Sequence, residues 1–219
     1  MKYRYKRNPY IYEILPTLNV GCYDMPIIKP TQIEPSEIMN LITFNYVNTC
    51  KNPSETYVCF YVDDYQFERV WKDPKTAIEI LKQFKGVIAP DFSVYADFPE
   101  PLKKYNVWRN KVLTALFQNA GINVIPNIQW ADPQSYSYCF AGLPKNSVVA
   151  ISSNGCLKSK VARQLFIDGF KMMQYILEPS KIIVVGQLPK ELAGELNVTQ
   201  YMGYGSMFGK AEHNLAIKG

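Results

Sequence analysis

A chain of 219 residues with 47% hydrophobic and 20% charged residues is long enough to form one domain with its own hydrophobic core. This composition excludes a low-complexity or disordered protein. No run of about 18 apolar residues and no apolar leader segment occurs, so we expect a protein that is neither exported nor bound to a membrane. The formal net charge of +5 is carried largely by Lys2, Arg4, Lys6 and Arg7, which leaves the rest of the chain nearly neutral.

The five cysteines are odd in number and show no CxxC spacing. A disulfide framework is therefore disfavoured, and reduced thiols in a cytoplasmic setting are expected. The basic, tyrosine-rich N-terminus has two interpretations: a segment that touches phosphates, or a solvated chain end.

Residues 1–55 are predicted to be the least regular part of the chain, because six prolines interrupt them between Pro9 and Pro53. Short strands are expected at 26–28 and 41–44. At the other end, residues 202–219 form a glycine-rich tail. We expect a single α/β domain over residues 1–219, with no linker that divides it.

From Thr56 onward, apolar strands alternate with amphipathic helices. Strands are predicted at 57–62, 87–89, 123–128, 148–151, 182–185 and 198–201. Helices are predicted after Asp73 and Pro74, which give an N-cap and a first-turn proline, and at about 100–119 and 158–177. The alternation indicates parallel βα units, and an open three-layer sheet is preferred over a compact or incomplete (β/α) barrel.

Polar side chains follow the predicted strands at their carboxyl ends. In both kinds of parallel fold this edge carries the binding site, so we expect these side chains to share a cleft. They are Asp63, Asp64, Asp91, Ser93, Gln129, Trp130, Asp132, Ser152, Ser153 and Asn154.

The aspartates of this set suggest a magnesium site. Mg²⁺ prefers carboxylate oxygens and commonly bridges to phosphates, so Asp63, Asp64 and Asp91 are predicted metal ligands. Asp64, Asp91 and Asp132 are the predicted catalytic residues, either around the metal or as an acid–base pair. The simpler interpretation is that each aspartate caps a helix or forms a turn.

Substrate-binding roles are predicted for five further residues. Arg109, on a predicted helix, is the cation placed to meet an anionic group, with a solvated helix face as the alternative. Trp130, at a strand end, suits stacking on a base or sugar, or else core packing. Ser152, Ser153 and Asn154 precede a helix, where backbone amides attract anions or simply need caps.

Several chemistries are excluded by missing residues. His213 is the only histidine, which excludes Ser-His-Asp, Cys-His and multi-histidine zinc sites. Neither GxGxxG nor GxxxxGK[ST] occurs, so standard dinucleotide and P-loop sites are not expected.

Four segments carry a resemblance: DDYQFERVW (63–71), PDFS (90–93), GINVIPNIQW (121–130) and SYSYCFAGLPKNSVVAISSNG (135–155). Together they resemble a family of bacterial, phage and plasmid proteins catalogued as a domain of unknown function, number forty-four seventeen. The resemblance covers about residues 20–186 and implies a phage or mobile-element context, but no activity. Ala131 and Phe117 depart from the glycine and tryptophan common in relatives.

Two functional hypotheses follow. The first is an accessory protein that binds or processes a nucleotide or nucleic-acid phosphate with Mg²⁺. The second is a non-catalytic protein that binds a host protein or nucleic acid through its basic terminus and aromatic surface. A glycosidase-like carboxylate pair fits the acids, but no sugar-specific motif supports it. Whether the protein is an enzyme stays open.

Overall fold

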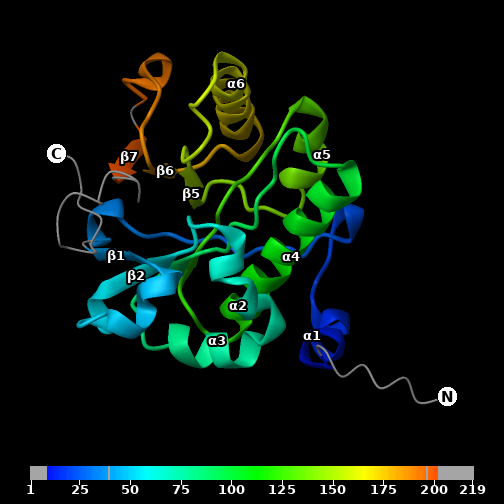
Figure 1. Cartoon of the computed structure of the whole chain (residues 1–219), viewed down its shortest axis with the longest axis vertical. Coiled ribbons are helices and arrows are strands. Elements are labelled where there is room, and N and C mark those ends of the chain that lie inside the picture. The colour runs from blue at the N-terminus through cyan, green and yellow to red at the C-terminus, as the bar shows by residue number, and fades with distance from the viewer. Residues whose placement is uncertain (1–8, 39, 196, 202–219) are drawn as a thin grey trace.

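The computed structural model describes residues 9–38, 40–195 and 197–201, and over these residues the strands form two neighbouring parallel sheets (Figure 1). One sheet has the order β1-β2-β3-β4 and the other the order β5-β6-β7, with every pair parallel. The strands are β1 Asn40–Thr43, β2 Thr56–Cys59, β3 Gly86–Ile88, β4 Val124–Ile125, β5 Val148–Ser152, β6 Lys181–Val185 and β7 Val198–Tyr201.

The two sheets meet between β4 and β5. A parallel bridge pairs Asn127 with Ala150, and the Ile128 amide donates to the Ala150 carbonyl at 2.8 Å. The strands therefore follow one another in chain order, and all of their carboxyl ends lie on the same edge. The predicted parallel α/β architecture is confirmed, and the sheets remain open: within the described chain no ladder joins β7 to β1, although the Tyr201 hydroxyl donates to the Pro35 carbonyl at 2.7 Å.

The helices lie where sequence signals place their ends. The Asp73 carboxylate accepts hydrogen bonds from the Thr76 amide at 3.2 Å and hydroxyl at 2.7 Å, so α3 begins at Pro74 as predicted. Ser159 caps α6 in the same way through the Ala162 amide. The described helices are α1 Pro9–Ile14, α2 Glu68–Lys72, α3 Pro74–Leu81, α4 Glu100–Asn119, α5 Tyr136–Cys139 and α6 Lys160–Leu177.

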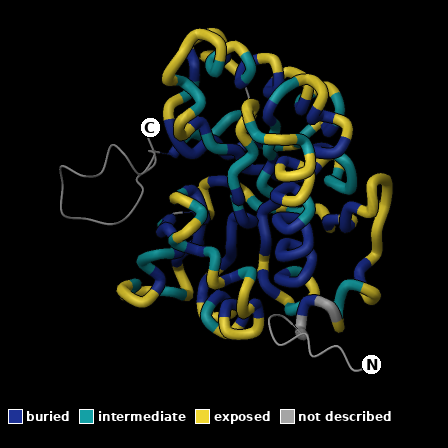
Figure 2. Tube along the Cα trace, turned by 45° about the vertical axis from the view of Figure 1, so that its right-hand side comes forward, coloured by how far each residue is buried: buried dark blue, intermediate teal, exposed yellow. Residues whose placement is uncertain are grey.

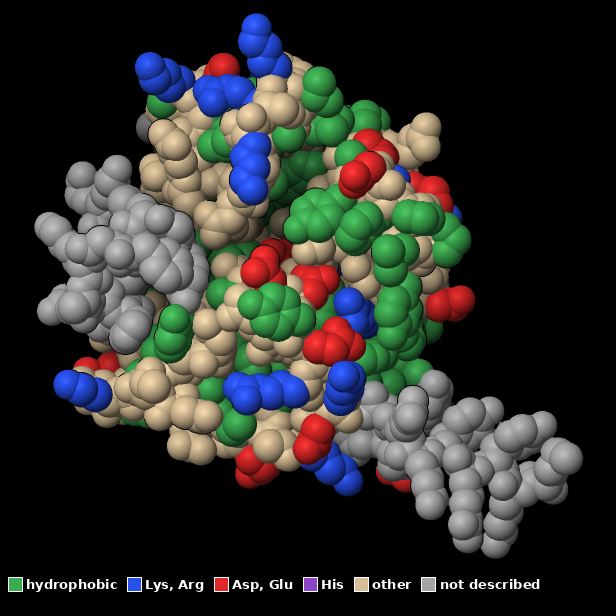
Figure 3. Space-filling model, in the orientation of Figure 1, with side chains coloured by type: hydrophobic (Ala, Val, Ile, Leu, Met, Phe, Trp, Pro, Cys, Tyr) green, Lys and Arg blue, Asp and Glu red, His purple; other side chains and the backbone are tan. Residues whose placement is uncertain are grey.

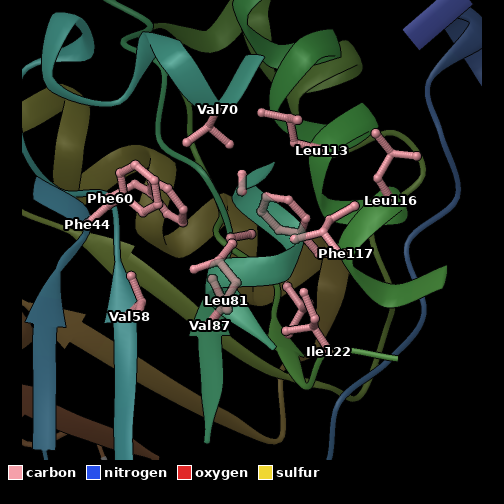
Figure 4. Close-up of a cluster of buried hydrophobic side chains, with 14 of the residues drawn as sticks. Phe44, Val58, Phe60, Val70, Leu81, Val87, Leu113, Leu116, Phe117 and Ile122 are labelled. Atoms are coloured by element: carbon pink, nitrogen blue, oxygen red, sulfur yellow. The ribbon is translucent and has the colours of Figure 1, made fainter. Parts of the chain in front are cut away.

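Alternating strand residues build cores on both faces of the sheets. Val58 and Val87 pack with α2, α3 and the second half of α4, in the cluster drawn in Figure 4. Their neighbours Tyr57 and Ile88 point to the other face and join apolar residues from β5, β6 and β7. A third cluster packs α5 and α6 against β5 and β6. Figure 2 shows the resulting pattern, with buried chain inside and exposed turns outside.

Several sequence expectations change in detail. The strand predicted at 26–28 is a single antiparallel bridge between Val20 and Pro26. The strand predicted at 123–128 shortens to β4, because Pro126 has no N–H to donate to a ladder. The basic terminus and the glycine-rich tail lie outside the described residues. All five cysteines are free thiols. Among the described helices, none combines the length and apolar character that crossing a membrane requires.

Candidate functional site

A pocket of about 210 Å³ lies where β3, β4 and β5 end. Its walls come from the segments that follow these three strands and from the first turns of α6. Figure 3 shows a hollow near the middle of one face, with acidic side chains below it and Lys or Arg side chains also nearby. The lining residues are Asp91, Ser93, Val94, Tyr95, Ala96, Ile128, Gln129, Trp130, Ala131, Ser152, Asn154, Gly155, Cys156, Ala162, Leu165 and Phe166.

The pocket combines apolar walls with one charged side chain. Ile128, Trp130 and Phe166 supply apolar and aromatic surface. Asp91 is the one carboxylic acid in the lining, and no Lys, Arg or His belongs to it in the described part of the chain. A phosphate inside this pocket would meet no cationic side chain from those residues. The lining instead suits an uncharged or cationic group that carries hydrogen-bond donors.

Asp91 is held by two amides through one of its oxygens. Asn127 Nδ2 donates to Asp91 Oδ1 at 2.7 Å, and Gln129 Nε2 donates to the same oxygen at 2.6 Å. Asp91 Oδ2 accepts no hydrogen bond from the described residues. Burial raises the pKa of Asp91 to about 6, with the Asn127 hydrogen bond opposing the rise and the nearby Asp64 charge adding to it.

A carboxyl group with this pKa exchanges its proton close to neutral pH. Asp91 can therefore accept hydrogen bonds as a carboxylate or donate a proton as an acid within a narrow pH range. The Cys156 thiol in the same lining behaves differently. Burial and the Asp91 charge raise the pKa of Cys156 to about 11, so it stays a neutral thiol at pH 7 and is not an activated nucleophile.

Asp64 is joined to the loop that contains Asp91 through Ser93. The Ser93 amide donates to Asp64 Oδ1 at 3.1 Å, and the Ser93 hydroxyl donates to the same oxygen at 2.9 Å. The structure thus brings Asp64 and Asp91 to neighbouring positions, with Ser93 and Asp91 in the pocket wall. Asp63 lies at the start of the turn Asp64–Gln66 and is not in the lining. The described residues contain no group of three or more acidic, histidine or cysteine side chains that could hold a metal ion.

Arg109 is buried and engaged by acids rather than open to the pocket. Its Nη1 donates to Glu68 Oε2 at 2.9 Å, its Nη2 lies 3.9 Å from Asp64 Oδ2, and its guanidinium stacks 3.4 Å from the Phe92 ring centre. It is absent from the residues that line the pocket. In this position Arg109 ties α4 to α2 and to the loop after β2, and its charge is already balanced.

Asp132 lies apart from Asp91. Lys103 Nζ donates to Asp132 Oδ2 at 2.8 Å, and the Ser135 amide donates to Asp132 Oδ1 at 3.0 Å. Burial would raise the pKa of Asp132, but the hydrogen bonds from Lys103 and the Ser135 amide outweigh it and lower the pKa. The carboxylate therefore caps the turn Pro133–Ser135 and pairs with α4. It does not line the pocket.

Trp130, Ser152 and Asn154 do line the pocket, as predicted from their positions at the carboxyl ends of parallel strands. Trp130 Nε1 donates to the Leu165 carbonyl at 3.1 Å, which fixes the indole against α6. The Ser152 hydroxyl donates to the Val185 carbonyl at 3.2 Å and accepts from the Asn154 amide at 3.1 Å. Ser153 points elsewhere: it is buried, it is not in the lining, and its hydroxyl has no partner among the described residues.

Comparison with known proteins places the chain in a family. The family model described as "Domain of unknown function (DUF4417)" matches residues 18–202. The chain belongs to this family. The resemblance expected from the four motifs is thereby confirmed.

Curated relatives of the chain come from phages. The chain is 34% identical over 172 residues to "Gene 1 protein" of Mycobacterium phage L5, a match that covers 77% of this chain and 73% of the relative. It is 32% identical over 170 residues to "Gene 1 protein" of Mycobacterium phage D29, covering 77% of this chain and 62% of that protein. No solved structure matches the chain. The phage context expected of the family therefore agrees with its relatives.

The search for polar residues at the strand ends missed three residues around Asp91: Tyr61, Asn110 and Asn127. The Tyr61 hydroxyl donates to Asn127 Oδ1 at 2.9 Å, and Asn110 Nδ2 donates to Gln129 Oε1 at 2.5 Å. The sequence held a signal for Asn127, because two amides spaced two residues apart after a strand point to the same side. Asn127 and Gln129 have that spacing. Asn110 lies in the middle of α4, where no pattern distinguished it from a surface residue.

Proposed function

We propose that this protein binds a nucleotide by taking its nucleobase into the pocket at the ends of β3, β4 and β5. The observation that carries the proposal is the environment of Asp91. One carboxylate oxygen is held by two amides, and the other is left to accept a hydrogen bond inside a pocket with apolar walls. The amino group and ring N–H of a base are donors that such an oxygen pairs with.

The aromatic residues in the pocket wall suit the flat, apolar face of a nucleobase. Trp130 is fixed by its hydrogen bond to Leu165, and its ring centre lies 5.5 Å from that of Phe166. Ile128 adds aliphatic surface. Stacking of a base on an aromatic side chain contributes about 1–3 kcal/mol and tolerates any base. Trp130 therefore supplies affinity in this proposal, and Asp91 supplies the choice of hydrogen-bonding edge.

The phosphate would lie outside the pocket, because the described lining offers it no cation. Asp64 is joined to the pocket wall through Ser93, so a phosphate on that side would be favoured by a bridging cation. Mg²⁺ is usually held by one or two carboxylates together with phosphate oxygens. The sequence predicted Mg²⁺ with Asp63, Asp64 and Asp91 as ligands. We keep the proposed dependence on Mg²⁺ with Asp63 and Asp64 and assign Asp91 to the base instead. We also keep a cytoplasmic location as part of the proposal.

Thermal unfolding with a panel of small molecules tests the proposal. We expect adenosine, cytidine or guanosine to raise the melting temperature of the full chain at pH 7.5, and the corresponding nucleotides to do so more strongly with Mg²⁺ than without it. Asp91→Asn should abolish the rise, whereas the exposed neighbour Asp97→Asn should keep it. A short single strand, measured in parallel, distinguishes a free nucleotide from a nucleotide within a chain.

Agmatine provides the decisive counter-test. Its guanidinium also donates to a carboxylate but has no base to stack. A melting temperature that rises with agmatine and with no nucleoside would overturn the proposal. The alternative function, binding of a host protein or nucleic acid through the basic terminus, stays a prediction. It requires salt-sensitive retention on DNA, RNA or a host protein that is lost when residues 1–7 are removed.

A further inference from the structure

The two amides that hold Asp91 are themselves held by side chains outside the pocket. Asn127 receives the Tyr61 hydroxyl on its Oδ1 at 2.9 Å, and Gln129 receives Asn110 Nδ2 on its Oε1. Neither Tyr61 nor Asn110 lines the pocket. Both lie behind it, Tyr61 two residues beyond β2 and Asn110 within α4.

Backbone carbonyls fix which end of each amide faces Asp91. Asn127 Nδ2 donates to the Pro90 carbonyl at 3.2 Å as well as to Asp91, and Gln129 Nε2 donates to the Phe92 carbonyl at 2.9 Å. A carbonyl can only accept, so the NH₂ end of each amide must point this way. The opposite ends are then oxygens, which need the donors that Tyr61 and Asn110 supply.

Asn110 is oriented in turn by the backbone. Its Oδ1 accepts from the Phe92 amide at 2.9 Å and its Nδ2 donates to the Phe92 carbonyl at 3.1 Å. The pair of bonds allows one amide orientation only. Tyr61 is buried in the apolar cluster that also contains Tyr57, and its hydroxyl donates to Asn127 Oδ1.

We infer that Tyr61 and Asn110 are positioning residues that lock both amides with their N–H groups on Asp91 Oδ1, so that Asp91 meets its ligand through Oδ2 as an acceptor. The inference rests on the proposed function and deepens it by naming the ligand edge. The pocket then prefers bases with an exocyclic amino group, which adenine, cytosine and guanine have. Uracil has no exocyclic amino group, and its ring N3–H lies between two carbonyl oxygens that the Asp91 carboxylate would repel, so it should bind less well.

The charge on Asp91 depends on this locking. The ionisable groups that face it are Asp64 from the turn after β2, Cys59 and Tyr61 from β2 and its extension, and Cys156 from the segment after β5. Burial and the Asp64 charge raise the pKa of Asp91, and the two amide bonds lower it. Loss of either amide bond should therefore raise the pKa further and keep the acid protonated to higher pH.

Tyr61→Phe is the sharpest test, because it removes one hydroxyl and leaves the ring. The readout is the ¹³C chemical shift of the Asp91 carboxyl, followed against pH in the ligand-free full chain. We expect the titration midpoint to rise by roughly 0.5–1 pH unit when the Asn127 amide is no longer held. Tyr57→Phe is the matched control. Tyr57 lies on β2, four residues before Tyr61, and belongs to the same apolar cluster, but its hydroxyl accepts from Asn123.

A second variant reaches Asp91 from the other amide. Gln129→Met keeps the side-chain length and removes the donor, and the midpoint should again rise. In the binding assay, Tyr61→Phe should lower the preference for cytidine over uridine at pH 7.5 by up to about tenfold, the scale of one lost hydrogen bond between neutral groups. The Tyr57→Phe protein should keep that preference.

The outcomes separate the two proposals. An Asp91 midpoint that stays unchanged in folded Tyr61→Phe or Gln129→Met protein, or that moves equally in Tyr57→Phe, overturns the positioning role. The titration needs no ligand. A shifted midpoint in a protein that binds no nucleoside would therefore uphold the positioning of Asp91 and overturn nucleobase binding alone.

Discussion

Two sets of polar side chains are joined to α4, and they differ in how completely their hydrogen bonds are satisfied within the protein. One set, which we call the α4–α5 clamp, consists of Lys103, Lys111 and Asp132. Lys111 Nζ donates to the carbonyls of Tyr138, Cys139 and Ala141 at 2.9, 2.8 and 2.6 Å, and Lys103 pairs with Asp132. All three side chains of the clamp have hydrogen-bond partners within the protein, although burial lowers the pKa of Lys111 to about 7.

The other set is Asp91 with Asn127 and Gln129. Here the amides are fully used, but the carboxylate keeps one oxygen without a donor from the described chain. A carboxylate oxygen that has no donor from the protein can accept a hydrogen bond from a ligand. The contrast explains why Asp91 and Asp132, which both follow strands, have pKa values displaced in opposite directions. The following substitutions test that contrast.

Lys111→Met should have the largest effect. It leaves three backbone carbonyls at the end of α5 without a donor, and we expect a loss of about 3–5 kcal/mol in the free energy of unfolding. Chemical denaturation measures it, with the exposed Lys171→Met on α6 as the control. A loss below about 1 kcal/mol would show that the clamp is not needed for the fold.

Asp91→Asn should stabilise the folded protein at neutral and alkaline pH, whereas Lys111→Met destabilises it. The folded-state pKa of Asp91 is about 6, above its ordinary value of 3.8, so the folded protein binds more protons between these values and loses stability as pH rises through them. Asparagine has no such cost. The variant should be more stable than the parent by up to about 3 kcal/mol at pH 8 and indistinguishable at pH 4 or below. Destabilisation at pH 8 would place Asp91 with the structural carboxylates.

Gly169→Ala should disturb the wall of the pocket. A Cβ at Gly169 of α6 would overlap the Trp130 indole, which the Leu165 carbonyl holds in place. Overpacking of this kind costs typically 1–3 kcal/mol, and we expect about 2 kcal/mol together with a change in the near-UV circular dichroism of tryptophan. Gly155→Ala offers a comparison, since a Cβ there meets no atom within 4 Å, although its φ of +79° adds strain of its own.

Asp132→Asn should give the smallest effect. The pKa of Asp132 is lowered in the folded protein, so its carboxylate stabilises the fold at neutral pH, and this contribution is lost as pH falls through the folded-state pKa. We expect a loss of about 1 kcal/mol at pH 7 that disappears in acid, because Lys103 and the Ser135 amide keep a neutral acceptor. A pH dependence like that of Asp91→Asn would remove the distinction between the two aspartates.

Sequence by itself determined the parallel βα organisation and the edge of the sheet at which to look. The strand runs from Thr56 onward, the Asp73–Pro74 helix start and the four family motifs depend on local residue order, and they were found close to where the pattern placed them, although β4 is shorter than predicted and 26–28 forms only a bridge. Asp91, Trp130, Ser152 and Asn154 were brought to one pocket for the same reason, since the carboxyl ends of parallel strands share an edge.

Only the tertiary structure decided which aspartate is left open. Asp132 turns to Lys103, Asp64 turns to Ser93, and Arg109 is taken by Glu68, pairings that join residues 29 to 41 positions apart. Tyr61 and Asn110 act on Asp91 through partners on other elements. The role of a carboxylate depends on the hydrogen-bond donors that packing brings to it. Which donors reach it is set by how helices and strands dock against one another, and not by its neighbours in the chain.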